Sequence, residues 1–239
     1  MPDSLIERGI VLAAGRGTRM GQMTEEIPKP MLPVQGRPML EHILERLGAA
    51  GIQRFLVVTG YQHKTVEEHF SKWPLPVEFC IQEPVNGTGS AALLARKFAG
   101  NEPFLLTYGD ILCEAEEYAR CGGVLVENGA SAAVLAVKAV DDPWQGAAVY
   151  EENGRIQRII EKPPKGSSTT HWNSAGFYAF RPVVFDYLAR LRPSPRNEYE
   201  LTSALDMMLE DGLDLHISPV QGTWRDVGRP EDLAAVNAQ

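Results

Sequence analysis

The sequence predicts an α/β fold in which a mostly parallel sheet is covered by helices on both faces. Three observations lead to this expectation. The chain has 239 residues, of which 44% are hydrophobic and 23% charged, and these are ordinary values for one large globular domain. Its first half alternates strand-like and helix-like segments. A glycine-rich loop follows the first strand-like segment, at the position where such folds bind ligands.

The first half contains short apolar runs separated by helix-forming segments. Pro38 suits the first position of a helix, apolar residues from Leu40 to Leu47 share one face, and Gly51 suits the C-terminal end. Thr88 is a plausible N-cap for a later helix. The predicted strands cover residues 10–14, 55–59, 77–81 and 104–107. The predicted helices cover residues 38–50, 65–72 and 88–99.

The second half is less regular and adds further strands. Asn153-Gly154 lies between two apolar runs and predicts a β-hairpin turn. Pro230 suits the first turn of a closing helix. The predicted strands cover residues 131–138, 147–150, 156–160, 175–180 and 213–217, and the predicted helices cover 183–191, 200–209 and 230–237. Because no internal repeat or interdomain linker is visible, we expect a single domain over residues 1–239.

Charge, hydropathy and cysteine content argue against several classes of protein. The net charge of −8 does not suit a nucleic-acid-binding protein with a broad basic face. No apolar run approaches a membrane span, and the first one leads into Arg16 rather than a signal-peptide cleavage site. The sparse cysteines form no CxxC pair and suggest a reducing compartment without structural zinc. We therefore expect a cytoplasmic protein without nucleic-acid or membrane partners.

The glycine-rich loop after the first predicted strand carries positive charge. Gly15 and Gly17 have no Cβ, so backbone N–H groups there can approach a polyphosphate closely. Arg16 and Arg19 lie in the same loop, and Lys29 follows between two prolines. These three basic residues can act on the same anion. The sequence therefore predicts a triphosphate cradle near the N-terminus and a protein that works on a nucleotide.

Two better-known phosphate loops do not fit this segment. The dinucleotide fingerprint requires glycine where Met20 stands, and an acidic residue near the end of the second strand, where Gly60 and Tyr61 follow instead. The P-loop requires Gly-Lys-Ser/Thr at the turn, which is absent. On glycine spacing alone, an ordinary strand-to-helix turn is an equally good interpretation. The two arginines and the Pro-Lys-Pro sequence favour the phosphate site.

Two aspartates follow the ends of predicted strands. Asp110 comes directly after Gly109 at the end of an apolar strand, and Asp226 ends the short run that begins at Trp224. Carboxylates that converge beside a triphosphate suit Mg²⁺, which prefers carboxylate and phosphate oxygens. Taken alone, each aspartate is equally well a turn or cap residue. Their pairing and their positions at strand ends favour a metal site.

Further polar residues at strand ends are candidates for substrate contacts. Glu161 and Lys162 could hold substrate hydroxyls and a second phosphate, or form a solvated ion pair. Asn173 and the exposed backbone at Gly176 suit sugar hydroxyls, or a plain turn. Gln82 can read a base edge through its amide group, or belong to a polar loop over a helix N-terminus. The residue types leave these alternatives open.

Eight motifs follow one another from Ile10 to about Leu233: LAAGRGTRMG, PKPMLPV, QEPVNGTGSA, YGD, EKP, NSAGFY, NEYELT and WRDVGRPEDL. In this order they resemble the sugar-phosphate nucleotidyltransferase family, which includes glucose-1-phosphate thymidylyltransferases and uridylyltransferases that make UDP-sugars. The resemblance implies a Rossmann-like mixed sheet flanked by helices, with sugar-binding strands added in the second half. The nucleotide-binding part would cover residues 1–130 approximately, and the sugar-binding part the remainder to residue 239.

The resemblance also implies roles for individual positions. It makes Arg19 and Lys29 catalytic, and it gives Mg²⁺ to Asp110 and Asp226. The positions that match nucleotide contacts are Ala13, Ala14, Gly15, Gly17, Thr18, Gln82, Gly87 and Thr88. The positions that match contacts to the sugar phosphate are Gly146, Glu161, Lys162, Asn173 and Gly176. The departures from the family pattern, at Ser174 and Arg229, touch no expected catalytic group. No hexapeptide repeat follows the last motif, so we expect no left-handed β-helix domain.

The implied reaction joins a nucleoside triphosphate, with UTP or dTTP favoured, to a sugar 1-phosphate and releases pyrophosphate. One alternative is a cytidylyl- or guanylyltransferase of the same fold, including a phosphocholine cytidylyltransferase, for which a cage of aromatic residues is conceivable. An alternative of another class is a non-catalytic regulatory subunit that binds a nucleotide sugar, but such a chain should have lost Lys29 or one of the aspartates. The sequence leaves the oligomeric state open, and a homo-oligomer is compatible with it.

Overall fold

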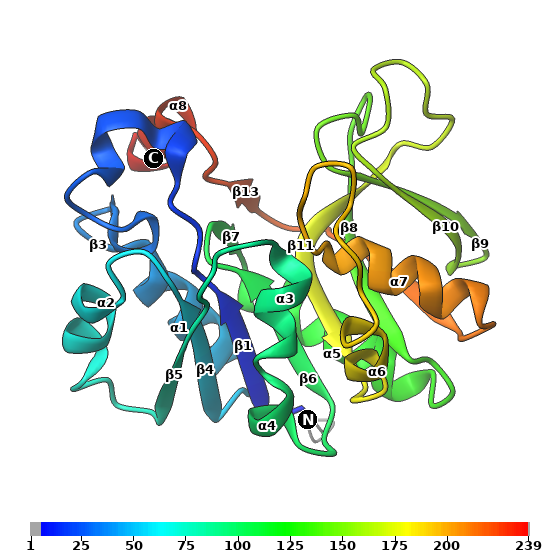
Figure 1. The fold of residues 1–239 in the computed structure, drawn as a ribbon, viewed down its shortest axis with the longest axis horizontal. Coiled ribbons are helices and arrows are strands. Elements are labelled where there is room, and N and C mark those ends of the chain that lie inside the picture. Colours follow the sequence, from blue (N-terminus) through cyan, green and yellow to red (C-terminus); the bar gives the residue numbers. More distant parts are fainter. Residues whose placement is uncertain (1–5, 239) are drawn as a thin grey trace.

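The computed structural model describes residues 6–238 of the chain, and this part forms a mixed α/β fold. A sheet of nine strands, in the order β5-β4-β1-β6-β11-β8-β12-β10-β9, runs through it (Figure 1). Strands from both halves of the sequence therefore belong to one sheet, and the predicted fold class is confirmed.

The first half of the chain supplies the parallel side of the sheet. β1 lies between β4 and β6, and Ile10 is in register with Leu56 on one side and Leu106 on the other. β4 pairs in turn with β5. Because all four strands run the same way, the segments that follow them meet at one edge of the sheet. The four strands are β1 (Arg8–Leu12), β4 (Arg54–Thr59), β5 (Val77–Ile81) and β6 (Phe104–Tyr108).

The second half extends the same sheet, largely with antiparallel pairs. β11 lies antiparallel between β6 and β8, and β12 runs parallel to β8. β9 and β10 form the predicted hairpin, in which Asn153 and Gly154 have φ values of 54° and 82°. These strands are β8 (Ala133–Ala139), β9 (Ala147–Glu152), β10 (Arg155–Glu161), β11 (Trp172–Phe180) and β12 (Leu215–Pro219).

Helices cover both faces of the sheet and form two hydrophobic cores. Alternate residues of β1 enter different cores, because Val11 packs in one and Ile10 and Leu12 pack in the other. The first core includes α1 (Met39–Ala49), α2 (His63–Phe70), α5 (Ala115–Glu127) and α8 (Pro230–Asn237). The second includes α3 (Thr88–Leu93), α4 (Arg96–Ala99), α6 (Val184–Leu188) and α7 (Leu201–Glu210). Within residues 6–238, no helix has the length and hydropathy needed to cross a membrane.

Short elements lie at the edge where the parallel strands end. The 3₁₀ helices η1 and η2 follow β1, and β13 pairs with β7 in a separate two-stranded sheet. Near η1, β2 and β3 form another small sheet, and α8 contacts β2 (Figure 1). Their bounds are η1 (Thr18–Thr24), η2 (Lys29–Met31), β2 (Pro33–Val34), β3 (Arg37–Pro38), β7 (Ile111–Cys113) and β13 (Trp224–Asp226).

Several element boundaries differ from the sequence prediction. The helix predicted over residues 88–99 is two helices, because the backbone tightens to i→i−3 hydrogen bonds at Leu94 and Ala95. Thr88 is not the N-cap, which is Gly87. Instead, the Thr88 hydroxyl oxygen accepts a hydrogen bond from the Leu201 N–H at 3.1 Å. Pro38 precedes the first residue of α1 with extended backbone and so lies just outside the helix.

The helix α5 was not predicted from the sequence. Its inward face, with Tyr118, Cys121 and Leu125 buried, has the i, i+3, i+7 spacing of a helix. The acidic Glu117 lies buried beside these residues, and the pair Gly122-Gly123 lowers the helix propensity of the segment. The apolar signal of the segment is therefore weak, although the helix packs against β11 and β8.

Asp206 on α7 makes the stability of the fold depend on pH. Burial, followed by repulsion from Glu210, raises the pKa of Asp206 from 3.8 to about 6, although the Ile159 N–H opposes this rise. Between these values the folded chain holds a proton that the unfolded chain has released, so stability falls as pH rises through that window.

Asp206→Asn should therefore stabilise the protein at pH 7. A shift of this size corresponds to at most about 3 kcal/mol, and we expect roughly 1 kcal/mol because the site is partly hydrated. Urea denaturation at pH 7 and pH 4 measures the gain, which should nearly vanish at pH 4, where Asp206 is also neutral. An equal gain at both pH values would contradict this explanation.

Candidate active site

The loop after β1, which was predicted to bind phosphate, folds tightly around Gly17. Gly17 has φ 65°, and a Cβ there would lie 3.0 Å from Lys29 Cβ and 3.1 Å from Thr24 Cγ2. Any larger residue would be strained and would push Lys29 aside. The Thr24 hydroxyl donates a hydrogen bond to the Gly17 carbonyl oxygen at 3.1 Å and to that of Gly21 at 3.2 Å. Glycine at position 17 therefore allows the loop to fold tightly over Lys29.

Lys29 lies directly against Asp110. Only 9% of Lys29 is exposed, and its Nζ donates a hydrogen bond to Asp110 Oδ2. Gly109 brings the end of β6 close to the loop after β1, because a Cβ at Gly109 would lie 3.0 Å from Ala13 Cβ. The Gly109 N–H also donates to the Leu12 carbonyl oxygen at 2.8 Å. The structure thus brings together a cation and a carboxylate that are 81 residues apart in the sequence.

Asp226 reaches the same place from the C-terminal part of the chain. In the pair β13–β7 it is opposite Ile111, the neighbour of Asp110, and the Val227 N–H donates to the Asp110 carbonyl oxygen at 2.9 Å. A Cβ at Gly228 would lie 3.3 Å from Asp226 Oδ1 and 3.4 Å from an Arg19 guanidinium nitrogen. Gly228 therefore leaves room for Arg19 to approach Asp226.

The charges of this cluster affect one another. Asp226 is open to solvent on one side, but desolvation, followed by repulsion from Asp110, raises its pKa to about 6, while Lys29 and Arg19 oppose the rise. A divalent cation would relieve the repulsion between the two carboxylates. Within residues 6–238, no group of three or more His, Cys, Asp or Glu side chains could hold a metal. The two aspartates would therefore need oxygen ligands from a substrate or water.

The proposed base-recognition residues lie at the carboxyl end of β5. Gln82 is 5% exposed, and its Nε2 donates to the Gly87 carbonyl oxygen at 2.9 Å and to Ser90 Oγ at 2.8 Å. The amide nitrogen of Gln82 therefore shapes the turn before α3. Gly87 has φ 128°, and a Cβ there would lie 2.4 Å from the Tyr199 carbonyl oxygen, so this turn packs tightly against the segment before α7.

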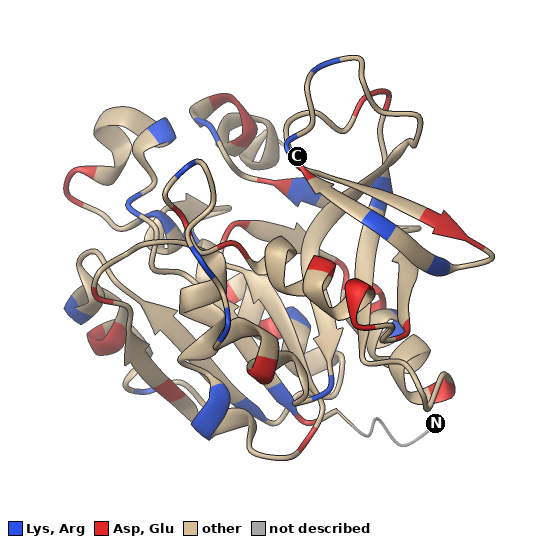
Figure 2. Ribbon diagram, turned by 45° about the vertical axis from the view of Figure 1, so that its right-hand side comes forward, with Lys and Arg blue, Asp and Glu red and all other residues tan. Residues whose placement is uncertain are grey.

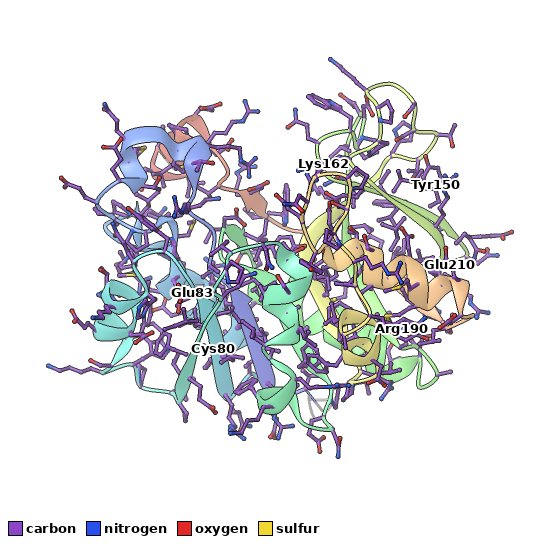
Figure 3. All side chains as sticks on the ribbon, in the orientation of Figure 1. Cys80, Glu83, Tyr150, Lys162, Arg190 and Glu210 are labelled. Atoms are coloured by element: carbon purple, nitrogen blue, oxygen red, sulfur yellow. The ribbon has the colours of Figure 1, made fainter. Side chains whose placement is uncertain are left out.

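Glu161 is the last residue of β10, and Lys162 follows it. The Thr202 hydroxyl donates to Glu161 Oε2 at 3.1 Å, and Arg196 lies 3.8 Å from Glu161 Oε1. Burial, followed by repulsion from Glu200, raises the pKa of Glu161 above its ordinary value. Lys162 has φ 43°, its N–H donates to the Gly146 carbonyl oxygen at 2.8 Å, and its side chain is exposed at the end of β10 (Figure 3).

Asn173 and Gly176 shape the start of β11. A Cβ at Gly146 would lie 2.3 Å from Asn173 Oδ1, so these two residues touch. Asn173 Nδ2 donates to the Ser174 carbonyl oxygen, whereas Oδ1 is buried and has no hydrogen-bond partner within residues 6–238. Such an acceptor is available to a substrate hydroxyl. The β11–β8 register shifts after Ser174. Gly176 in this segment has φ 78°, and a Cβ placed on it would lie 2.9 Å from Ile111 Cγ1, so β11 approaches β7 closely here.

Two groups of predicted residues thus lie on either side of β6 and β7. The first contains Arg19, Lys29, Asp110 and Asp226, and the second contains Gly146, Glu161, Lys162, Asn173 and Gly176. Gly176 joins them, since it contacts both Ile111 and Tyr108. Acidic and basic residues are interspersed over the ribbon, with several basic residues on the loops at the upper edge (Figure 2). The arrangement can hold two anionic groups next to each other.

Comparison with known proteins identifies the family. Residues 8–239 match the family model described as nucleotidyl transferase, which is nearly the whole chain. The chain belongs to the nucleotidyl transferase family.

Individual nucleotidyl transferases resemble the chain to different extents. The bifunctional protein GlmU of Methanococcus maripaludis is 35% identical over 230 residues, covering 96% of this chain and 53% of that protein. The chain thus spans about half the length of the GlmU relatives that it matches. The UTP–glucose-1-phosphate uridylyltransferase AglF of Haloferax volcanii is 33% identical over 235 residues, which cover 94% of this chain and 93% of AglF.

Solved structures of the family share the fold. A candidate glucose-1-phosphate thymidylyltransferase from Bacillus anthracis, in complex with sucrose, matches with a TM-score of 0.84 and 27% identity, over 97% of this chain and 94% of that one. A UDP-glucose pyrophosphorylase complexed with UDP-glucose matches with a TM-score of 0.87 at 22% identity, over 98% of this chain and 97% of the other. At that identity, the second match shows the fold alone.

Tyr61 is a further residue of the candidate site of this nucleotidyl transferase, and it was not predicted from the sequence. It follows β4 and contacts the loop after β1 near both of its ends, at Arg16 and at Glu25. The Arg16 guanidinium lies 5.8 Å from the centre of the Tyr61 ring, and the Tyr61 hydroxyl donates to the Glu25 carbonyl oxygen at 2.8 Å. Gln62 Nε2 donates to the same oxygen at 2.9 Å. The position of Tyr61 after a parallel strand was the available signal.

Tyr61→Phe should weaken nucleotide binding selectively. The aromatic ring and its contact with Arg16 remain, while the hydrogen bond from the hydroxyl to Glu25 is lost. Part of the binding free energy of the nucleotide would then be used to order the loop after β1. One hydrogen bond contributes about 1 kcal/mol, so we expect a three- to fivefold rise in the KM for the nucleotide, approximately. Steady-state kinetics with each substrate varied in turn measures this. A rise of the same size in the KM for the sugar phosphate would contradict a role limited to the phosphate loop.

Proposed function

We propose that this nucleotidyl transferase joins a nucleoside triphosphate, with UTP or dTTP favoured, to a sugar 1-phosphate and releases pyrophosphate. The observation that carries the proposal is the gathering of Lys29, Arg19, Asp110 and Asp226 from distant parts of the chain at the end of β1. A second support is that AglF, which is matched over nearly its full length, is named as a UTP–glucose-1-phosphate uridylyltransferase.

In this proposal the single domain has two functional parts. Residues up to about 130 bind the nucleotide through the loop after β1 and the turn at Gln82. The remaining residues bind the sugar 1-phosphate beside β10 and β11. Asn173 would accept a hydrogen bond from a sugar hydroxyl, because its Oδ1 is unpartnered within residues 6–238 and needs a donor. Glu161 would accept from another hydroxyl, and Lys162 would pair with the sugar phosphate.

The reaction needs charge neutralisation more than a base. A phosphate oxygen of the sugar 1-phosphate, which is anionic at neutral pH, attacks the α-phosphorus in line. An O–P bond forms, the bond to the bridging oxygen breaks, and pyrophosphate leaves with that electron pair. Two unit charges at about 4 Å repel by about 4 kcal/mol at an effective dielectric near 20. Arg19, Lys29 and Lys162 would offset this repulsion and stabilise the leaving pyrophosphate.

Asp110 and Asp226 would hold Mg²⁺ in this proposal. Their oxygens are the hard donors that Mg²⁺ prefers. The pKa of Asp226 is raised by desolvation and then by repulsion from Asp110, and a bound cation would relieve that repulsion. When bound, Mg²⁺ supplies positive charge to phosphate oxygens of the nucleotide. Lys29 already neutralises part of the charge of Asp110, and it would do the same for the triphosphate.

A pyrophosphate-release assay tests the function. UTP, dTTP, CTP and GTP are each combined with glucose 1-phosphate, N-acetylglucosamine 1-phosphate, mannose 1-phosphate or phosphocholine, with and without Mg²⁺. Release with UTP or dTTP and a sugar 1-phosphate supports the proposal. Release only with CTP and phosphocholine would replace it with a choline-phosphate transferase. If no pyrophosphate is released but calorimetry shows that the chain binds a nucleotide sugar, the chain would be a regulatory subunit.

A further inference from the structure

Asp226 lies on a short strand, β13, that pairs with a single strand in the described part of the chain. β13 has three residues, and its partner in the two-stranded sheet is β7. β7 itself begins one residue after Asp110. The segment of residues 220–223 connects β12 to β13, and the Nε1–H of Trp224 on β13 donates to the Ala175 carbonyl oxygen at 2.8 Å, so the segment and this bond both help to place β13. The contacts of this segment therefore influence the position of Asp226 relative to Asp110.

Glu117 of α5 binds this connecting segment. Its Oε1 accepts a hydrogen bond from the Gly222 N–H at 2.8 Å, and its Oε2 accepts one from the Gln221 N–H at 3.2 Å and one from Arg120. The neighbouring Glu114 N–H donates to the Thr223 carbonyl oxygen at 3.4 Å. A Cβ at Gly222 would lie 3.1 Å from Glu117 Oε1, so the contact is tight. The start of α5 thus binds the N–H groups of residues 221 and 222 and the carbonyl oxygen of residue 223.

Glu117 is a buried charge, which requires an explanation. It is 3% exposed, and burial alone would raise its pKa, but the hydrogen bonds from Arg120, Gly222 and Gln221 leave the pKa below its ordinary value. The N-terminal turn of a helix also favours a negative charge. A buried carboxylate with several donors is a strong anchor, because removing it leaves backbone N–H groups without a partner.

We propose that Glu117 is a positioning residue that fixes residues 221–223 so that β13 presents Asp226 beside Asp110. Glu117 itself does not belong to the metal-binding pair, and it acts through the backbone of the segment that leads to Asp226. The inference rests on the proposed function, in which the two aspartates hold a divalent cation. It goes beyond that function by assigning a role to a residue on a different element, α5.

The test measures metal binding as well as activity. Mn²⁺ binding to the complete chain with UTP is followed by electron paramagnetic resonance in Glu117→Ala, in Glu117→Gln and in the control Glu116→Gln, which alters an exposed residue of the same helix turn. We expect Mn²⁺ affinity to fall at least fivefold in Glu117→Ala and less in Glu117→Gln, whose amide oxygen can still accept from Gly222. The control should match the wild-type chain. If Glu117→Ala does not fold, Glu117→Gln carries the comparison.

A double-mutant cycle separates positioning from general support of the fold. When Asp226 is already replaced by Ala, Glu117→Gln should cause no further loss of Mn²⁺ affinity, because its effect passes through Asp226. Equal losses in both backgrounds, or unchanged Mn²⁺ affinity in Glu117→Ala and Glu117→Gln, would overturn the proposal while leaving the proposed function intact. A wild-type chain that binds no Mn²⁺ with UTP and releases no pyrophosphate would overturn both.

Discussion

Lys29→Ala and Asp226→Ala are each expected to lower kcat by roughly 10²–10³ while the chain remains folded. Lys29 is the buried cation of the cluster, and Asp226 is one of its two carboxylates. The reaction brings one anion onto another, so each fixed charge contributes to the transition state more than to substrate binding. Asp110→Ala should have an effect of the same size, because Asp110 is bound to Lys29 and adjoins Asp226.

Pyrophosphate release at saturating substrates measures these losses, and urea denaturation checks the fold. The fold should survive Lys29→Ala, because the remaining carboxylate of Asp110 is partly accessible to water. Lys97→Ala, which removes an exposed lysine from α4, is a matched control and should leave kcat unchanged. Turnover near that of the wild-type chain in all three cluster variants would contradict the mechanism.

Gly87→Ala is the second substitution with a large expected effect, and this effect is on stability. The φ of 128° is unfavourable for alanine, and the added Cβ would lie 2.4 Å from the Tyr199 carbonyl oxygen and 2.6 Å from its nitrogen. Both atoms are backbone and cannot rotate away. Strain and overpacking together should cost about 2–4 kcal/mol of unfolding free energy. The turn bound by Gln82 should shift, which would also raise the KM for the nucleotide.

Gly212→Ala is the control for Gly87→Ala. Gly212 has φ 77°, and no atom lies within 4 Å of a Cβ placed there. Gly212→Ala should therefore lower the free energy of unfolding only by the cost of a left-handed backbone at alanine, about 1 kcal/mol. Urea denaturation of both variants separates the two contributions. If Gly87→Ala were no less stable than Gly212→Ala, the contact with Tyr199 would not be the constraint that we describe.

The centre of the parallel half of the sheet could be predicted from the sequence because strands such as β4 are continuous apolar runs buried on both faces, whereas β5 at the edge contains Glu78 and is only partly buried. Phe55 and Val57 enter one core, Leu56 and Val58 enter the other, and no polar alternation obscures the strand. α5 could not be predicted in the same way. One position of its inward face is Glu117, whose buried carboxylate is satisfied by Arg120 and by backbone donors from a segment 104–105 residues later.

The sequence predicts which residues belong to the candidate site more readily than it predicts their contacts with one another. Lys29 between two prolines and the aspartates at strand ends carry local signals, and the structure places them together. For Gln82 the sequence indicated an amide ready for a base, whereas its nitrogen is bound to Gly87 and Ser90. Side-chain partners of this kind depend on the conformation of a turn, and that conformation depends on Tyr199, far away in the sequence.

β11 has a consequence for motion during turnover. It is hydrogen-bonded to β6 of the first half and, on both sides of the register shift after Ser174, to β8 of the second, so the two halves share one sheet. The two halves cannot swing about a hinge, as separate lobes do, without breaking those bonds. In the proposed reaction, closing over the substrates is therefore a task for the connecting segments at the sheet edge, and the overall dimensions of the molecule in solution should stay constant during turnover.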